Sequence, residues 1–395
     1  MEDFVNDKIR ERLKHHYHDF TVKQFVEQMN TGKFCSSKAA CRIHGKSCKA
    51  LRAALHCAGP PCTDWSTQWY NHLKRLGPTY LVTLIWMSQR LLIREVCVLH
   101  ENVAAFDVSL LQMVLGSVYA IFSHVYDAQE LGWPSSRKRR ITLLVRKDCL
   151  LHIVVPWNEF VSSCNRRVGC SWHTYMVANA SELSSELQWA RQRASSLYQL
   201  TDEQLWEALT VEGNAHGICP TELHALYMTS VYSQALNASE LRRLFLYIEL
   251  AKSEGSSLEH LHCYVTQDPI DHPQGSVSTI LQTVIKSGGA MWSYTHCRWL
   301  TPSELFMSQG FAVDSSISSF QETSFLMRAR EGRTRNDLFH QCGNSMNVEV
   351  VALGILWSLF LVETSAPIEL NSFMRGLLAL QRGGRRDGDD SSDSE

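Results

Sequence analysis

A cysteine that stands directly behind two prolines is the first residue of this sequence with a clear chemical use. The stretch GPPCTDW at 59–65 places Cys62 after Pro60 and Pro61, each of which locks the backbone φ angle and removes a hydrogen-bond donor. A thiolate is a nucleophile, and a rigid loop after a strand is a common position for a reactive group in α/β proteins. The alternative interpretation is a buried loop corner, because free cysteine is among the most buried residue types.

Further polar residues that suit catalysis or binding follow in three later stretches. Glu101 and Asn102 end the apolar run EVCVLHENV, and Arg137 and Arg139 lie in DAQELGWPSSRKRRI. The last stretch contains RWLTPSELFMSQGF and then CGNSM. Its polar residues are Arg298, Thr301, Glu304, Asn344 and Ser345.

The segments that must position these residues alternate between strand and helix patterns. We predict a strand within 51–59, a helix over most of 71–94, a buried strand over 95–103, a helix followed by a strand in 109–128, and a strand over 139–147. Strands that alternate with helices and carry polar residues at their ends favour a mostly parallel, doubly wound sheet. The fold class predicted is therefore α/β and Rossmann-like.

The remaining segments are less regular. Residues 3–30 have a helical pattern, and helices are expected within 180–200 and 239–255, between loops rich in His, Cys, Ser and Gly. This middle region is interpreted as a smaller domain inserted into the first. Near the end, within 341–360, a Gly-Asn-Ser turn is expected to open a strongly apolar helix.

Composition limits the class of protein. The 395 residues suffice for two domains, and the sequence has neither an apolar run long enough for a membrane span nor a recognisable signal peptide. Thirteen irregularly spaced cysteines indicate reduced thiols and an intracellular protein. The Asn-x-Ser sequons at Asn179 and Asn237 are then interpreted as chance matches.

Two groups of potential zinc ligands do not have the pattern of a metal site. The first group has spacings that match no zinc knuckle, and the second is one ligand short. They consist of Cys35, Cys41, His44 and Cys48, and of Cys164, Cys170 and His173. No metal site is therefore predicted.

Charge is distributed unevenly along the chain. The formal net charge is −2, but residues 387–395 alone contain five acidic side chains, so the rest of the chain is slightly basic. Basic clusters at 135–140 and 165–169 are compatible with a polyanionic partner. The acidic end has nothing apolar to bury and is predicted to be disordered.

Five short motifs, in this order, resemble those of the C5-cytosine DNA methyltransferase family: the Pro-Cys loop, Glu-Asn-Val, Arg-x-Arg after Gly-x-Pro, Arg-x-Leu-Thr-x-x-Glu with Gln-Gly-Phe, and Gly-Asn-Ser. The resemblance covers roughly 50–147 and 295–362. It implies a Rossmann-like catalytic domain that uses S-adenosylmethionine and methylates carbon 5 of cytosine in DNA. The irregular middle region lies where the family has its target-recognition domain.

The resemblance also implies catalytic roles. Cys62 is the nucleophile that adds to cytosine C6, Glu101 stabilises the adduct at N3, and Asn102 holds the Pro-Cys loop by hydrogen bonding. Arg139 contacts the cytosine O2, and Arg137 supports Glu101 or the loop.

Other matched positions are implied to bind the cofactor or to support the site. Those at the methionine side of S-adenosylmethionine are Pro60, Pro61, Asn344 and Ser345. Those that support the site structurally are Arg298, Thr301 and Glu304.

The expected domains are a first catalytic part at 1–147, a target-recognition-like domain at 148–297, the C-terminal catalytic part at 298–362, and a tail at 363–395. The expected partner is double-stranded DNA with the target cytosine flipped out of the helix. Phosphate contacts are expected from the middle region, with Arg166, Arg167 and Arg191 as candidates. No membrane partner is expected, and a eukaryotic protein of this kind would act in the nucleus.

The family's glycine-rich cofactor loop has no counterpart ahead of Cys62, since the first glycine of the sequence is Gly32. The sheet is therefore expected to lack its first strand, and the chain to be either a fragment or a member with weak cofactor binding. One alternative function is a catalytically impaired protein that binds nucleic acid or a protein partner. The other is methylation of RNA cytosine, although the Cys-Phe-Thr signature of that branch is absent from SYTHCRWLTP.

Overall fold

The computed structural model describes residues 38–41, 46–49, 53–66, 78–269, 276–285, 290–311, 313 and 334–365. The helix expected over 3–30, the cysteine and histidine at positions 35 and 44, and the acidic tail lie outside these residues. The described residues belong to two compact units. Unit 1 draws on 1–127, 138–165 and 349–395, and unit 2 on 128–137 and 166–348.

The sheet of unit 1 consists of β3 (Leu55–Ala58), β4 (Cys97–Val103), β6 (Arg139–Arg146) and β5 (Tyr119–Tyr126), in that order. All four strands lie within the predicted segments, and the α/β class is confirmed. The described strands agree with a mostly parallel sheet, because β3, β4 and β5 run in the same direction, and the exception is β6, which is antiparallel to its neighbours β4 and β5. The reason is the connection from β5 to β6, which contains only the short 3-10 helix η5 (Ala128–Glu130) and no crossover helix to reverse the chain direction.

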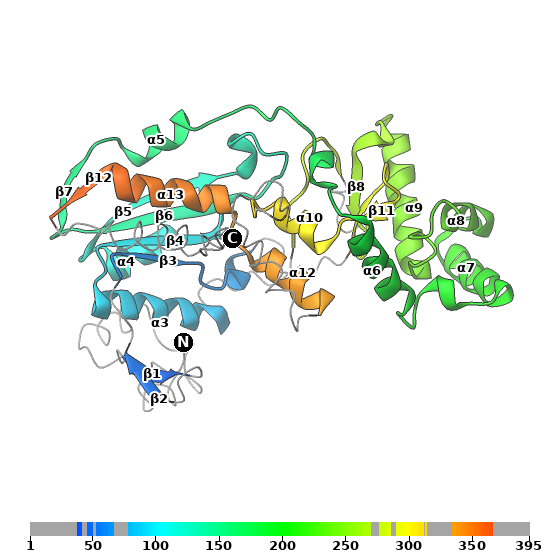
Figure 1. Ribbon diagram of the computed structural model, residues 1–395, viewed down its shortest axis with the longest axis horizontal. Coiled ribbons are helices and arrows are strands. Elements are labelled where there is room, and N and C mark those ends of the chain that lie inside the picture. Colours follow the sequence, from blue (N-terminus) through cyan, green and yellow to red (C-terminus); the bar gives the residue numbers. More distant parts are fainter. Residues whose placement is uncertain are drawn as a thin grey trace, which may run out of the picture. The chain divides into compact units, whose positions relative to one another are not determined.

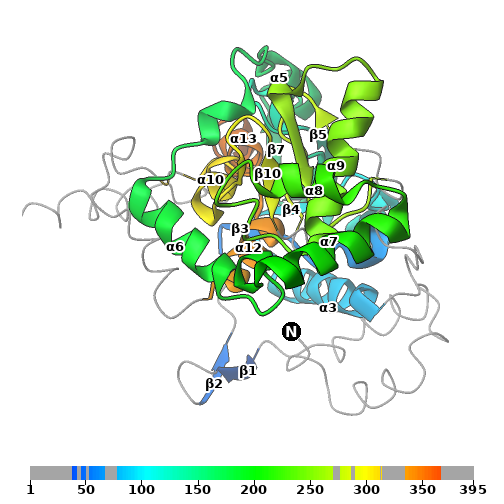
Figure 2. The same ribbon diagram turned by 90° about the vertical axis from the view of Figure 1, so that its right-hand side faces the viewer.

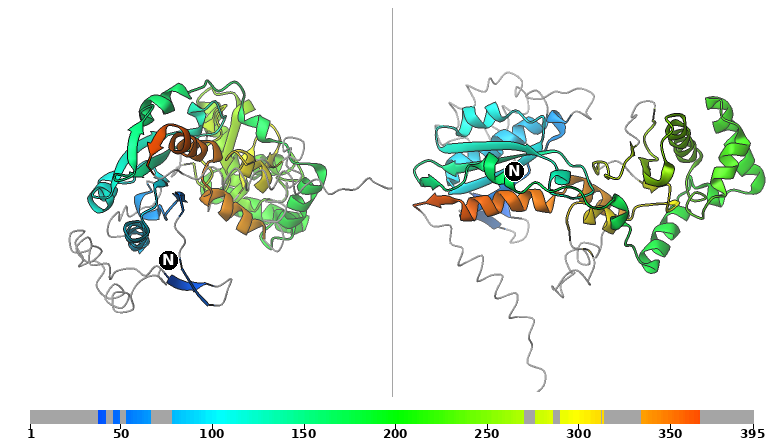
Figure 3. Two further views of the ribbon diagram at one scale, coloured as in Figure 1. Left: turned by 60° about the vertical axis from the view of Figure 1, so that its left-hand side comes forward. Right: turned by 90° about the horizontal axis from the view of Figure 1, so that it is seen from above.

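Helices cover both faces of this sheet (Figures 1 and 3). On one face, α3 (Pro78–Ile93) and α4 (Val108–Leu115) enclose a core that includes Val98 and Leu144. On the other face lies α13 (Val348–Phe360), where a Cβ atom on Gly354 would come within 2.5 Å of Leu99. Glycine thus lets the helix pack on β4 without displacing the end of the Leu99 side chain. A doubly wound sheet was predicted, and helices on both faces of the sheet agree with that prediction.

Unit 1 also contains three smaller elements beside this sheet. Strands β7 (Leu150–Ile153) and β12 (Val362–Thr364) pair antiparallel, and α5 (Trp157–Ser163) follows β7. A two-stranded antiparallel ribbon is formed by β1 (Lys38–Cys41) and β2 (Lys46–Lys49). Among the described residues, no helix is both long enough and apolar enough to cross a bilayer.

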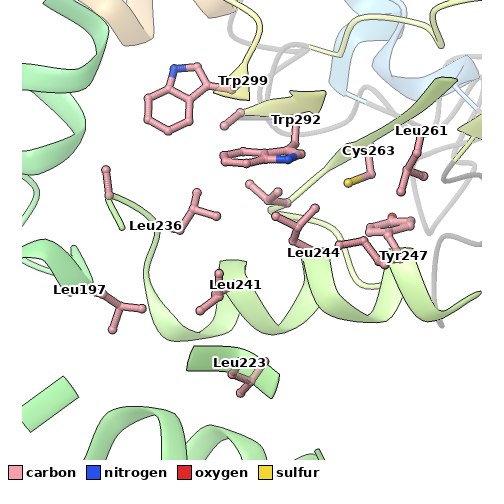
Figure 4. Packing of buried hydrophobic residues seen from close by; sticks show 14 of the residues in the cluster. Leu197, Leu223, Leu236, Leu241, Leu244, Tyr247, Leu261, Cys263, Trp292 and Trp299 are labelled. Carbon is pink, nitrogen blue, oxygen red and sulfur yellow. The ribbon is translucent and has the colours of Figure 1, made fainter. Parts of the chain in front are cut away.

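Unit 2 combines helices with a small antiparallel sheet. Helices α6 (Ala180–Arg191), α7 (Asp202–His216), α8 (Pro220–Tyr227) and α9 (Ala238–Ser253) precede most of the strands. The strand order is β11 (Arg298–Trp299), β10 (Met291–Ser293), β8 (Leu261–Tyr264) and β9 (Ser276–Val277). Figure 4 shows Leu241, Leu244 and Tyr247 of α9 facing Trp292 of β10 in the core of this unit.

Two further helices of unit 2 carry the late sequence motifs. Helix α10 (Pro302–Met307) follows β11, and α12 (Arg335–Asn344) ends on the Gly-Asn-Ser motif. The expected turn is therefore partly wrong: Gly343 and Asn344 are the last residues of a helix and Ser345 is its C-cap. Thr334 begins this helix with a capping box, and helix formation continues to the motif because a single glycine costs only about 1 kcal/mol in a helix.

The compact units differ in their bounds from the expected domains. Residues 148–165 belong to unit 1 rather than to the middle region, and 298–348 belong to unit 2. The reason for the second difference is that residues of α10 and α12 share a core with the middle region, including Tyr264, Met291, Leu305 and Phe339. As a division into functional domains, the expected boundaries remain a prediction.

Candidate active site

The carboxyl group of Glu101 forms an ion pair across two strands of unit 1. Glu101 lies near the C-terminal end of β4, and Arg139 is the first residue of β6, opposite Val103. Residues two positions apart on a strand share a face, so Arg139 is the diagonal neighbour of Glu101. Its Nε atom lies 3.0 Å from Glu101 Oε1, with the two side chains 14% and 11% exposed. The pair is thus partly shielded from water and its geometry is set by the strand register.

The loop that carries Cys62 begins at the same edge of the sheet. Ala58, the last residue of β3, is paired with His100 of the parallel strand β4, so both chains leave the sheet in the same direction. Asn102 Nδ2 donates a hydrogen bond to the carbonyl oxygen of Pro60 at 3.4 Å. This is the contact that the sequence predicted for the asparagine. Cys62 is half-buried, and its carbonyl accepts from the Trp65 amide at 3.0 Å.

Asp64 anchors the other side of this loop, a role that the sequence analysis missed. Its buried carboxylate accepts hydrogen bonds from the backbone amides of Thr79 and Tyr80 at 2.8 and 2.9 Å, and from the Thr79 hydroxyl at 2.5 Å. These amides belong to the first turn of α3, where a carboxylate is favoured by the helix dipole. The neighbouring Trp65 packs against Phe106, with ring centroids 5.1 Å apart. In the sequence, the feature that could have revealed this role is the acidic residue two positions after the cysteine.

The strand residue before Glu101 is a buried histidine. His100 is fully buried between Trp86 and Phe106, whose ring centroids lie 5.1 and 4.7 Å from its own. Burial lowers the pKa of His100 to about 3, so its ring is neutral at physiological pH. Neither of its ring nitrogens has a hydrogen-bond partner among the described residues. The face of β4 opposite to Glu101 thus carries an uncharged histidine that is enclosed by aromatic rings.

Arg137 has partners other than those expected. This residue belongs to unit 2, is buried, and donates to the carbonyl oxygens of Val284 at 3.0 Å, Gly343 at 3.1 Å and Ser345 at 2.5 Å. The ion pair that holds the Glu101 carboxyl group comes from Arg139. Carbonyl groups at a helix C-terminus lack intrahelical donors, and a guanidinium supplies several at once. Arg137 is therefore a positioning residue for the end of α12.

The three residues expected to support the site form a buried cluster in unit 2. Thr301 caps α10 in a capping box with Glu304, whose carboxylate is fully buried. Arg298 donates two hydrogen bonds to this carboxylate, at 2.7 and 2.8 Å, and the amide of Ala178 donates a third at 3.0 Å. Because every charge is paired, the cluster fixes the segment between β11 and α10 without an unpaired buried charge.

The positions expected to bind the cofactor are divided between the units. Pro60 and Pro61 lie in unit 1, whereas Asn344 and Ser345 lie in unit 2. The Ser345 hydroxyl donates to the Cys342 carbonyl at 2.7 Å and its own carbonyl accepts from Arg137, whereas Asn344 is exposed. Among the described residues, no glycine-rich turn follows a strand of the unit 1 sheet, and β3 pairs with no strand other than β4. Within either unit taken by itself, the described residues show no glycine-rich turn of the kind that cradles a nucleoside cofactor.

No group of three or more His, Cys, Asp or Glu side chains in the described part of the chain is arranged to hold a metal ion. Of the second set of potential zinc ligands, His173 contacts two other histidines instead. Its Nδ1 lies 3.1 Å from His296 Nε2, and its Nε2 lies 3.2 Å from His260 Nδ1.

Comparisons with known proteins agree with the motifs. A family model described as C-5 cytosine-specific DNA methylase matches residues 43–353. A methyltransferase of Entamoeba histolytica, EhMeth, is 11% identical, with 89% of this chain and 87% of that chain covered and a TM-score of 0.36. The Dnmt2 methyltransferase of S. pombe is 14% identical, with 78% of each chain covered and a TM-score of 0.40. A putative DNA modification methyltransferase from an E. coli prophage is also 14% identical, with 79% of each chain covered and a TM-score of 0.38. A search of curated proteins finds no match.

Proposed function

Because the chain belongs to the C-5 cytosine-specific DNA methylase family, we propose that it methylates carbon 5 of cytosine in DNA. The observation that carries this proposal is the position of Cys62 in the loop after β3 and of Glu101 near the C-terminal end of the parallel strand β4, where Glu101 is paired with Arg139 of β6. A nucleophile and a carboxyl group at one sheet edge suit addition to a heterocyclic ring. The proposed partner is double-stranded DNA and the proposed location is the nucleus.

In the proposed reaction, the Cys62 thiolate adds to C6 of the cytosine. The new bond joins Sγ to C6, and the displaced π electrons move through the ring to N3, which takes a proton from the Glu101 carboxyl group. Arg139 orients that carboxyl group, and the proposal assigns to it the contact with the exocyclic oxygen O2 of the cytosine. The resulting enamine is nucleophilic at C5. Once C5 has taken up an electrophile, which is a proton from water when no cofactor is bound, loss of the original C5 proton breaks the C6–S bond and expels the thiolate, and N3 returns its proton to Glu101.

S-adenosylmethionine is the proposed methyl donor, and it supplies an electrophilic methyl sulfonium group. Within either unit taken by itself, the described residues show no glycine-rich turn to cradle it, so no step is derived through it. The cytosine must leave the DNA stack to reach Cys62, because C6 is inaccessible inside the duplex.

The addition step is tested without any cofactor, by following tritium released from C5 of cytosine in a DNA duplex. Reversible addition of Cys62 makes C5 exchange its hydrogen with water, so the wild-type chain is expected to release tritium. Cys62→Ser is expected to abolish release, and Glu101→Gln to slow it by about 10²-fold or more. Cys57→Ser, which changes an exposed cysteine of β3, is the matched control and is expected to behave like the wild type.

A covalent trap with 5-fluorocytosine DNA and S-adenosylmethionine tests the complete reaction. If the folded wild-type chain neither exchanges tritium nor forms this adduct with varied DNA, the proposed activity is refuted. Parallel assays on transfer RNA separate the RNA alternative, and exchange confined to RNA would overturn the choice of DNA as substrate.

A further inference from the structure

The helices α7 and α8 of unit 2 form a surface with an unusual charge. From residue 194 to residue 241 the sequence has no lysine or arginine, but six acidic residues. Two of them are neutralised by neighbours: Glu212 pairs with Arg242 at 2.8 Å, and Glu240 pairs with Arg193 at 2.9 Å. The other four are exposed, namely Asp202, Glu203, Glu207 and Glu222. This surface is therefore strongly acidic.

The same surface exposes aromatic and aliphatic side chains. Trp206 of α7 is 40% exposed and stacks on His224 of α8, with ring centroids 4.6 Å apart and an interplanar angle of 16°. His224 stacks in turn on Tyr227, at 6.1 Å. Val211 and Met228 are 65% and 59% exposed. An exposed tryptophan that is already ordered by stacking is typical of a binding hot spot.

The acidic and apolar residues lie on one side of α7. Glu203, Glu207 and Val211 are spaced four residues apart, and Trp206 lies next to this row, so all four share the outward face of the helix. Leu205 and the rest of the buried row point into the core of unit 2, which is closed by α9. Figure 2 shows α7 and α8 side by side, with this part of the chain turned toward the viewer.

We propose that this face binds a lysine- and arginine-rich segment of a partner protein, with an aliphatic side chain as its anchor. We define the acidic aromatic face by six residues: Glu203, Trp206, Glu207, Val211, His224 and Met228. A cationic group that lies over the Trp206 ring is attracted by its π electrons and is flanked by two carboxylates one turn apart. In this proposal, the exposed side chains of Val211 and Met228 contact the aliphatic anchor of the partner. The proposal concerns binding only and does not depend on the proposed catalysis.

Charge complementarity decides the class of partner. Aromatic side chains also bind single-stranded nucleic acids by stacking on the bases, but such platforms lie in basic grooves that contact the phosphates. Here the carboxylates would repel a phosphate backbone. A basic protein segment satisfies both the charge and the apolar character of the face.

The test uses the full chain and a fluorescent synthetic peptide, an amphipathic helix with lysine and arginine on one face and leucine on the other. Fluorescence anisotropy is expected to show binding that Trp206→Ala weakens by about tenfold or more. The double variant Glu203→Gln, Glu207→Gln is expected to weaken it several-fold at low salt and to match the wild type at high salt. Leu151→Ala and Glu159→Gln make the same kinds of change on unit 1 and are expected to leave binding unchanged.

Three results would overturn the proposal: unchanged peptide affinity in the Trp206 variant, equal binding of an acidic peptide with the same leucine spacing, or duplex DNA or single-stranded RNA that binds at Trp206 more tightly than the basic peptide. If circular dichroism shows that Trp206→Ala unfolds the chain, the double glutamine variant decides. It retains the packing of α7 and changes charge alone.

Discussion

At the scale of single residues, Arg137 and Arg139 perform different tasks although only one residue separates them. Arg139 begins β6 and pairs with Glu101 at 3.0 Å, whereas Arg137 donates to three backbone carbonyls of unit 2. Compact unit 1 resumes at residue 138, so the chain changes unit between them. Substituting one arginine is therefore expected to have a different effect from substituting the other. Loss of Arg139 removes an ion pair at the candidate active site, and loss of Arg137 leaves helix-end carbonyls without donors.

The burial of His100 lets us predict how the free energy of unfolding depends on pH. Burial lowers its pKa from 6.5 to about 3, so between these pH values the unfolded chain binds a proton that the folded chain does not. The stabilising effect of keeping this ring neutral is complete above pH 6.5 and is lost as the pH falls toward 3. The loss amounts to at most about 1.4 kcal/mol per pH unit for one group.

We expect His100→Leu to reduce this acid-dependent loss, because leucine fills the space between two aromatic rings and cannot be protonated. Urea unfolding at several pH values between 7 and 4 measures the slope. His56 and His262, whose pKa values burial also lowers to about 4, are among the groups that keep part of this acid-dependent loss in the variant. The exposed His152→Leu is the control. A slope that is the same in His100→Leu as in the wild type would contradict the argument.

At the scale of elements, a repeated sequence begins two helices of unit 2. NASEL occurs at 179–183 and at 237–241, and in each case the asparagine is the N-cap of the helix that follows. Asn237 Oδ1 accepts from the Glu240 amide at 2.8 Å, and the Glu240 carboxylate accepts from the Asn237 amide at 3.0 Å. The two sequons are thus helix-start signals, in which the glutamate that follows completes or supports the cap.

Removing this cap is expected to destabilise unit 2. Asn237→Ala should lower the free energy of unfolding by about 1 kcal/mol, because the first turn of α9 loses the acceptor for its amide. Asn237→Asp retains an acceptor at the same position and is expected to unfold like the wild type. Chemical denaturation followed by circular dichroism compares the three chains. Equal losses in both variants would show that the amide nitrogen, rather than the capping oxygen, matters.

At the scale of the whole molecule, neither compact unit is a continuous stretch of chain. The polypeptide passes from unit 1 to unit 2 at residue 128, returns at 138, leaves again at 166 and returns at 349. The short segment 128–137 belongs to unit 2 and contains Ser135 and Arg137, whose side chains donate hydrogen bonds to carbonyl groups of that unit. Unit 2 therefore depends on residues that precede its main segment.

Cofactor binding is the property of the whole chain that most needs measurement. The described residues provide no glycine-lined cradle, and both polar groups of Ser345 are engaged within unit 2. We therefore expect isothermal titration calorimetry of residues 1–395 with S-adenosylmethionine to detect weak binding or none. S-adenosylhomocysteine is the matched ligand without the methyl group. Tight stoichiometric binding of either would show that another part of the chain forms the cradle.

The sequence by itself determined the features that depend on neighbouring residues. Apolar runs and breaks located β3, β4, β5 and β6, and short motifs identified the family and made Cys62 and Glu101 candidate site residues. The resemblance also predicted that Asn102 holds the Pro-Cys loop by a hydrogen bond, and the structure shows that the acceptor is the Pro60 carbonyl.

Only the tertiary structure decided the features that depend on distant segments. It made β6 antiparallel, paired Arg139 with Glu101, and placed Asp64 at the first turn of α3. It also buried His100 between two aromatic rings. The physical reason is that strand register and burial arise from packing between segments far apart in the chain, whereas periodicity and turn signals act within a few residues.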